Sequence, residues 1–136
     1  MEDYSKLDIK EYKYWKIMLH SNQCYLGTTV IWCKRGIIDF FDMSGAEKKE
    51  FWKITKKLRN VIIDLFNPDL INYVSLGNVT PHLHFKIMPR YKTKRVFKGF
   101  DFIDDRWGKN PSPYNKDFKI SEEIMMKLKE EIRKRL

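Results

Sequence analysis

Three polar side chains capable of phosphate chemistry alternate along a short stretch of the chain. His82, His84 and Lys86 are separated by single residues within "NVTPHLHFKIMPRY". The chain has only three histidines, so two of them at this spacing are unusual. Side chains two positions apart on a β-strand point to the same face, which predicts one row of two imidazoles and an ammonium group. The alternate residues are apolar and are expected to face the core: Leu83, Phe85 and Ile87.

A metal site is one chemistry that two closely spaced histidines allow. Zinc accepts imidazole ligands, but it needs a third protein ligand, and the neighbouring Lys86 cation would repel the ion. Cys24, Cys33 and His20 would serve only if the fold happened to bring them there. The sequence therefore predicts no metal site, and half-exposed histidines without a function are a better alternative.

Phosphate chemistry is the other functional interpretation of the row. A neutral imidazole is a good nucleophile when a backbone carbonyl holds its second nitrogen. A nearby cation and amide donors can stabilise the charged oxygens of a phosphoryl group during transfer. His84, flanked by His82, Lys86 and Asn78, supplies these groups. From the residues alone, this interpretation and the structural one both stay open.

Several segments with strand character must position this row. Apolar alternation and β-branched or aromatic residues predict strands over 14–20, 24–34, 70–76 and 82–88, with a turn at Asn22. The connector 35–43 has some strand character.

A long amphipathic helix is expected between the second and third of these strands. Ser44 followed by Glu47 is a capping box. Pro68 ends the helix because proline cannot continue it. One apolar face at helical spacing comprises Phe51, Ile54, Leu58, Val61, Ile62 and Leu65.

The C-terminal third has a different character. Residues 91–118 combine glycine and proline with aromatics and predict an irregular, ordered segment, and Ser121 caps a final helix over 121–135. We expect a single domain over 1–136, with a core at about 15–91 and a tail at 92–120. The expected fold class is α+β, with an antiparallel sheet of about five strands, one long packed helix and a C-terminal helix.

The composition of the chain indicates which classes of partner and which cellular compartment to expect. The net charge is +9, and residues 86–136 carry 15 basic against 8 acidic residues. This suits an anionic partner, although an ordinary solvated surface accounts for the charge alone. No apolar run spans a bilayer, the charged N-terminus shows no signal peptide, and the two cysteines form no paired motif. We therefore expect a cytoplasmic protein with free thiols and no membrane partner.

The segment "GNVTPHLHFKIMPRY" resembles the signature of the histidine triad (HIT) superfamily of nucleotide hydrolases and transferases, His-φ-His-φ-His-φ-φ, where φ is apolar. The resemblance covers about residues 15–114. "NQCYLGTTVIWCKRGIIDFFDMSGAEKKEF" resembles the family's second strand, connector and helix start. "LFNPDLINYVSLGN" is similar to the segment before the triad in diadenosine tetraphosphate hydrolases, and "VFKGFDFIDDRWGKNPSPY" resembles the tail of a prokaryotic branch.

The resemblance implies a HIT-like fold and a role for each site residue. His84 would be the nucleophile that attacks the α-phosphorus of a nucleotide, and His82 would position it. Asn78 would contact the phosphate; Gly77 beside it and Asn22 near the ribose would complete the substrate-binding set. The implied assembly is a homodimer through an extended sheet. No cofactor is required, and magnesium would arrive only with the nucleotide.

Lys86 departs from the family pattern, because it occupies the third histidine's position. In the superfamily's uridylyltransferases this position is glutamine, so nucleotidyl transfer does not require the histidine. We expect a hydrolase acting on a dinucleoside polyphosphate or a related nucleotidyl phosphate through a nucleotidyl-histidine. The alternatives are a nucleotidyltransferase or phosphorylase, and a nucleotide- or RNA-binding module with little turnover. Nucleic acid is the less favoured partner.

The aromatic and basic residues of the tail have two interpretations. They could stack on a base and touch phosphates, or they could cover the sheet. Packing is the favoured interpretation for most of this set, which comprises Phe97, Phe100, Phe102, Trp107, Lys98 and Arg106.

Overall fold

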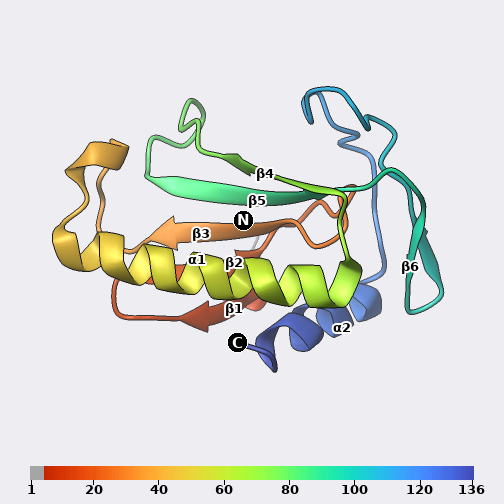
Figure 1. Cartoon of the computed structure of the whole chain (residues 1–136), viewed down its shortest axis with the longest axis horizontal. Coiled ribbons are helices and arrows are strands. Elements are labelled where there is room, and N and C mark those ends of the chain that lie inside the picture. The colour runs from red at the N-terminus through yellow and green to blue at the C-terminus, as the bar shows by residue number, and fades with distance from the viewer. Residues whose placement is uncertain (1–4) are drawn as a thin grey trace.

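A five-stranded antiparallel sheet forms the centre of the structure (Figure 1), a computed structural model that describes residues 5–136. Its order is β1-β2-β3-β5-β4, so β1 and β4 are the edge strands. The expected α+β class, with five strands, one long helix and a C-terminal helix, is confirmed. The strands are β1 (Asp8–Glu11), β2 (Trp15–Leu19), β3 (Thr29–Cys33), β4 (Leu70–Val74) and β5 (His84–Arg90).

Alternation along the central strands divides the sheet into two faces. Strands β2 and β3 each bury every second residue, and Ile17 pairs with Ile31 across the two strands. On β5, Phe85 and Ile87 are buried on this same core face, as predicted. The opposite face carries His84 and Lys86, which are both partly exposed.

Helix α1 (Gly45–Phe66) crosses the core face of the sheet (Figure 1). The predicted capping box at its N-terminus is confirmed: the Ser44 hydroxyl accepts the Glu47 N–H, and the Glu47 carboxylate accepts the Ser44 N–H. Asn67 ends the helix in the left-handed conformation, one residue before Pro68. Helix α2 (Glu122–Arg133) is capped by Ser121 and packs against β1 and α1.

Several strand boundaries differ from the sequence prediction, and β4 ends at Val74 instead of residue 76. The strand expected over 24–34 begins only at Thr29, because residues 24–27 form a turn in which Gly27 has φ +89°. The Gln23 side chain fixes this turn by accepting the Gly27 N–H and donating to the Thr28 carbonyl. The strand expected over 82–88 begins at His84. The connector 35–43 contains no strand, but a short 3₁₀ helix, η2 (Phe40–Asp42).

Four short elements were not predicted at all: η1 (Ser5–Leu7), β1, β6 (Arg95–Phe97) and β7 (Phe100–Phe102). Strand β1 follows the 3₁₀ helix η1 and pairs with β2 through a register shift. Within the tail, β6 and β7 form a separate hairpin. Its aromatic rings pack against the core, as the packing interpretation predicts. No helix among the described residues is long and apolar enough to cross a membrane.

Candidate functional site

His84 is the first residue of β5, and its ring has a defined orientation. The Nδ1 atom lies 2.6 Å from the backbone carbonyl oxygen of His82. A carbonyl oxygen can only accept, so Nδ1 carries the proton and donates it. The Nε2 atom of a neutral His84 therefore keeps its lone pair, which is the form that a nucleophilic imidazole requires.

His82 lies in the bend before β5, where its ring is held on two sides. Its Nε2–H donates to the carbonyl oxygen of Cys33 at the end of β3. Its ring stacks on Trp32 with centroids 3.9 Å apart and planes within 8°. These contacts fix the peptide whose carbonyl orients His84, so His82 supports the orientation of the His84 ring through its backbone.

Lys86 lies two residues beyond His84 on the same face of β5. Its neighbours across the sheet are Val30 of β3 and Val74 of β4. Its Nζ lies 5.6 Å from the ring centroid of Tyr114 in the tail. No carboxylate of a described residue forms an ion pair with Lys86, so the charge is available to an anion.

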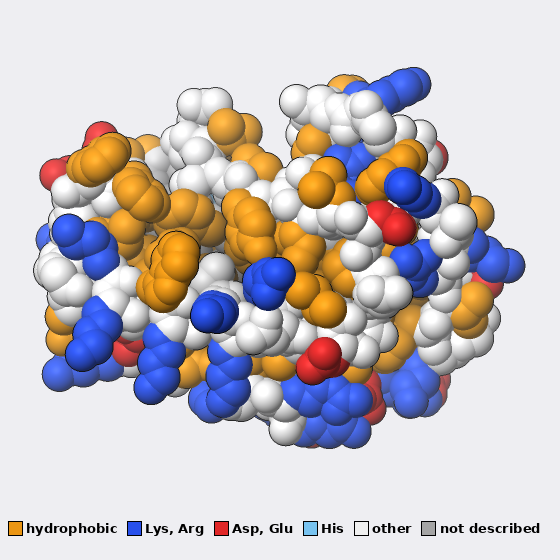
Figure 2. Space-filling model, viewed as in Figure 1, with side chains coloured by type: hydrophobic (Ala, Val, Ile, Leu, Met, Phe, Trp, Pro, Cys, Tyr) orange, Lys and Arg blue, Asp and Glu red, His pale blue; other side chains and the backbone are white. Residues whose placement is uncertain are grey.

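A cleft of about 1040 Å³ opens beside this row. Figure 2 shows the surface hollowed at its upper edge between two projections, which Figure 1 identifies as the β4–β5 loop and the tail. No residue lining it is acidic, so the cleft favours a negatively charged ligand. Its lining includes Gly77, Asn78, His84, Lys86, Met88, Lys109, Asn110, Pro111, Ser112 and Tyr114.

The β4–β5 loop brings two of the predicted substrate-binding residues into this cleft. Gly77 has φ +72°, a conformation that side chains rarely adopt, and it turns the chain before Asn78. Both residues line the cleft together with His84. Sequence reasoning missed Ser75, whose hydroxyl donates to the His84 carbonyl oxygen at 2.7 Å and ties the loop to the His84 backbone.

Asn22 does not line the cleft. Its side-chain Nδ2 donates to the Asn115 carbonyl oxygen at 2.9 Å, and its Oδ1 accepts the Cys24 N–H. The structure thus gives Asn22 a role in joining the β2–β3 turn to the tail. His20 in the same turn meets the ring of Tyr114 edge-on, with centroids 6.3 Å apart. Burial, and secondarily the Lys86 cation, lower the pKa of His20, while a hydrogen bond to the Asn22 backbone opposes them.

The candidate metal ligands do not converge. Cys33 contacts His82 through its carbonyl, while its thiol is directed at Glu47. Burial raises the pKa of the Cys24 thiol to about 11 and also raises that of Cys33, so both are poor ligands. Among the described residues, no group of three or more His, Cys, Asp or Glu side chains could hold a metal ion.

Trp32 and Tyr114 are two further residues near the row that sequence reasoning overlooked. Trp32 lies opposite His84 in the register of β3 and β5, and Tyr114 comes from a loop 28 positions after Lys86. Neither has a local motif that marks it. Only the pairing of β3 with β5 and the path of the tail bring them to the row.

A five-stranded sheet carrying a carbonyl-held histidine, a second histidine and a cleft without acidic lining residues is the arrangement expected of the histidine triad class. The model of the HIT domain matches residues 8–93, and the chain belongs to this family. No curated protein sequence matches the chain significantly.

Solved structures share this fold at low sequence identity. A histidine triad protein from Sinorhizobium meliloti has a TM-score of 0.80 at 16% identity, covering 96% of this chain and 89% of its own. One from Marinobacter aquaeolei has a TM-score of 0.79 at 18% identity, covering 95% and 87%. A hypothetical histidine triad nucleotide-binding protein from Sulfolobus tokodaii has a TM-score of 0.71 at 19% identity, covering 95% and 82%. At these identities the likeness concerns the fold alone.

Proposed function

We propose that this protein hydrolyses dinucleoside polyphosphates, or related nucleotidyl phosphates, through a covalent nucleotide on His84. The observation that carries the proposal is the bond from His84 Nδ1–H to the His82 carbonyl, which leaves Nε2 as the free nucleophilic nitrogen. The membership in the HIT family supports the same chemistry.

The first step forms a bond between Nε2 of His84 and the α-phosphorus. The bond from this phosphorus to the bridging oxygen breaks, and the remaining polyphosphate leaves with the bonding electrons. As Nε2 becomes positively charged, the His82 carbonyl stabilises the ring through its hydrogen bond to Nδ1–H. Lys86 and the amide of Asn78, which line the same cleft, balance negative charge on the phosphoryl oxygens.

The second step transfers the nucleotidyl group from His84 to water. Water attacks the α-phosphorus, the phosphorus–nitrogen bond breaks, and the electron pair returns to Nε2. One proton passes to solvent, and the nucleoside monophosphate is released. An acceptor phosphate in place of water would give the transferase or phosphorylase reaction instead, with the same His84 intermediate.

Lys86 favours leaving groups that need no proton. Its ammonium group donates and stays charged, whereas a histidine at this position could titrate near neutral pH and protonate a departing oxygen. A polyphosphate is a weak base and leaves without protonation. Lys86 therefore supports a dinucleoside polyphosphate in preference to substrates with a more basic leaving group.

A partly exposed apolar strip on the same sheet face suits the nucleoside. Met18 pairs with Val30 across β2 and β3, and Trp32 follows two residues along β3, beside His84. Apolar and aromatic side chains beside a polar centre are the usual lining of a small-molecule site. Within this proposal no metal is bound by the protein, and magnesium accompanies the polyphosphate.

We also propose that the protein is a homodimer joined through β4. This edge strand has one free side, and its side chains Leu70 and Tyr73 are exposed. An apolar groove continues from it toward α1, where Trp52 is 73% exposed. Antiparallel pairing of two copies of β4 would cover both the free edge of the strand and this apolar groove. Sedimentation should show a dimer that Tyr73→Glu dissociates; a monomeric wild-type protein would refute the dimer.

The function is tested by a screen of nucleotide substrates with product analysis. His84→Ala should abolish turnover, with a loss well beyond the roughly ten- to thousandfold expected from removing one electrostatic helper, and should still bind nucleotide. Mass spectrometry without acid should find a nucleotidyl adduct on His84 of the wild-type protein. Near-normal turnover by His84→Ala would refute the nucleophile. If the wild-type protein binds nucleotide without turning it over, the alternative function, a nucleotide-binding module, would be favoured instead.

A further inference from the structure

The cleft extends well beyond the nucleophile, along β5 toward the tail. His84 is the first residue of β5 and Arg90 is the last, a separation of six residues or about 20 Å. His84, Lys86 and Met88 alternate along the cleft side of this strand. The far wall is formed by the tail residues Lys109, Asn110, Pro111, Ser112 and Tyr114.

Arg90 fixes this far wall from beneath. It is only 2% exposed, and its guanidinium forms a two-pronged ion pair with Asp104 at 2.7 and 3.2 Å. The remaining donors reach the carbonyl oxygens of Arg106 at 2.7 Å and Lys109 at 3.2 Å, and the side-chain oxygen of Asn72 at 3.0 Å. The last residue of the nucleophile's own strand therefore places the backbone of Lys109.

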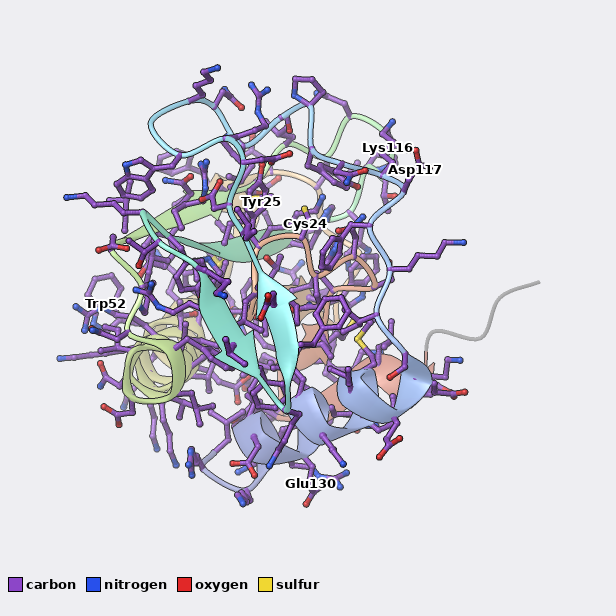
Figure 3. All side chains as sticks on the ribbon, turned by 90° about the vertical axis from the view of Figure 1, so that its right-hand side faces the viewer. Cys24, Tyr25, Trp52, Lys116, Asp117 and Glu130 are labelled. Atoms are coloured by element: carbon purple, nitrogen blue, oxygen red, sulfur yellow. The ribbon has the colours of Figure 1, made fainter. Side chains whose placement is uncertain are left out.

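Further hydrogen bonds hold the backbone of this wall in place. Arg106 donates to the carbonyl oxygens of Asn110 and Ser112 at 2.7 and 3.2 Å. The Tyr25 hydroxyl donates to the Pro111 carbonyl at 2.6 Å, while its ring lies 4.7 Å from the Arg90 guanidinium carbon. Figure 3 shows Tyr25 beneath the tail and Lys116 at the tail's outer side.

Lys109 is the one cation that this wall presents to the cleft. It forms no ion pair with a described residue, and the cleft contains no carboxylate that would neutralise it. Its backbone carbonyl oxygen accepts a hydrogen bond from Arg90. Arg90 follows Lys86 by four residues, or about 13 Å of strand. The cleft therefore carries one unpaired ammonium beside the nucleophile and a second one toward its far end.

We propose that Lys109, assisted by the neutral donors of Asn110 and Ser112, forms a second anion subsite that binds the distal phosphates of the substrate. The inference rests on the proposed function, because Lys86 and His84 would hold the α-phosphate while Lys109 holds the departing end. Two cations separated along one cleft select by the length of the anion: a chain long enough to reach both binds better than a short one. Lys109 is thus a specificity residue, and Arg90 positions it.

The test compares substrates of increasing phosphate number. Lys109→Ala should raise KM for diadenosine tetraphosphate about tenfold more than KM for adenosine 5′-phosphoramidate, which has no distal phosphate. Lys116→Ala removes another exposed lysine, which does not line the cleft, and it should change neither KM. Arg90→Lys should shift KM in the same direction as Lys109→Ala, because lysine cannot hold Asp104 and the two carbonyls in one plane.

A binding measurement separates this inference from the catalytic one. Calorimetry with inorganic tripolyphosphate on the His84→Ala protein should show about tenfold weaker binding when Lys109→Ala is added, and unchanged binding when Lys116→Ala is added. Equal tripolyphosphate affinity in both double variants, or equal effects of Lys109→Ala on both substrates, would overturn the subsite. The proposed function would survive that result; it fails if His84→Ala retains turnover or if the wild-type protein binds nucleotide without turning it over.

Discussion

Replacing Lys86 by alanine tests the altered position of the triad directly. Lys86 forms no ion pair with a described residue, and its Nζ lies 5.6 Å from the ring centroid of Tyr114. Its removal leaves no carboxylate unpaired, so the fold should lose little stability. The cost should instead appear when a phosphate is present, because the ammonium group then has an anion to stabilise.

The size of the effect follows from the position of Lys86 in a cleft open to water. Two unit charges about 4 Å apart attract by about 4 kcal/mol at the effective dielectric constant near a protein surface. Desolvation and the ordering of a long side chain offset part of this, and a hydrogen bond to a charged group contributes about 1.5–3 kcal/mol. We therefore expect Lys86→Ala to lower kcat/KM for diadenosine tetraphosphate by about 10- to 150-fold.

The assay is steady-state hydrolysis followed by nucleotide chromatography, with Lys116→Ala as the matched control. Lys86→His should restore part of the loss, and its rate relative to the wild type should rise as pH falls through roughly 6.5, where an imidazole gains its charge. Taking the ratio cancels any pH dependence that the two proteins share. Normal kcat and KM in Lys86→Ala would show that Lys86 has no part in the reaction and would refute this reasoning.

Two further predictions concern the supports of the fold and are measured by urea unfolding. Hydrogen bonds from Arg35 hold the pKa of Glu47 at about 2, below its ordinary 4.5, so this carboxylate stabilises the fold above pH 4.5 and loses the effect as pH falls toward 2. Glu47→Gln keeps an acceptor for the Ser44 N–H, and its stability deficit should therefore shrink over this pH range; a constant deficit would contradict the assignment. Asp104→Ala should cost about 3–5 kcal/mol because it leaves the Arg90 charge buried. Asp101→Ala, which breaks an exposed pair with Lys94, should cost less than about 1 kcal/mol, and equal costs would refute the role of burial.

Local patterns in the sequence determined the main elements. The Ser44–Glu47 pair and the apolar face behind it predicted α1 because a helix satisfies its end groups and buries one stripe through contacts within a few residues. Alternation predicted the two faces of β2 and β5 in the same way. The turn at 24–27 was missed because the Gln23 side chain forms it against a sequence rich in strand-forming residues. Strand β1 was missed because its charged sequence has strand geometry only through pairing with β2.

The candidate site likewise has features that the sequence predicted and features that only the tertiary structure decided. The spacing of His82, His84 and Lys86 was visible in the sequence, since neighbours on one strand face are set by chain geometry alone. The sequence could not determine the proton position on His84, because the carbonyl's direction depends on how the bend before β5 is held. The far wall of the cleft depends on a buried ion pair between Arg90 and Asp104, 14 residues apart. Such a pair forms only where the fold excludes water from both groups, and that exclusion is a property of the tertiary structure.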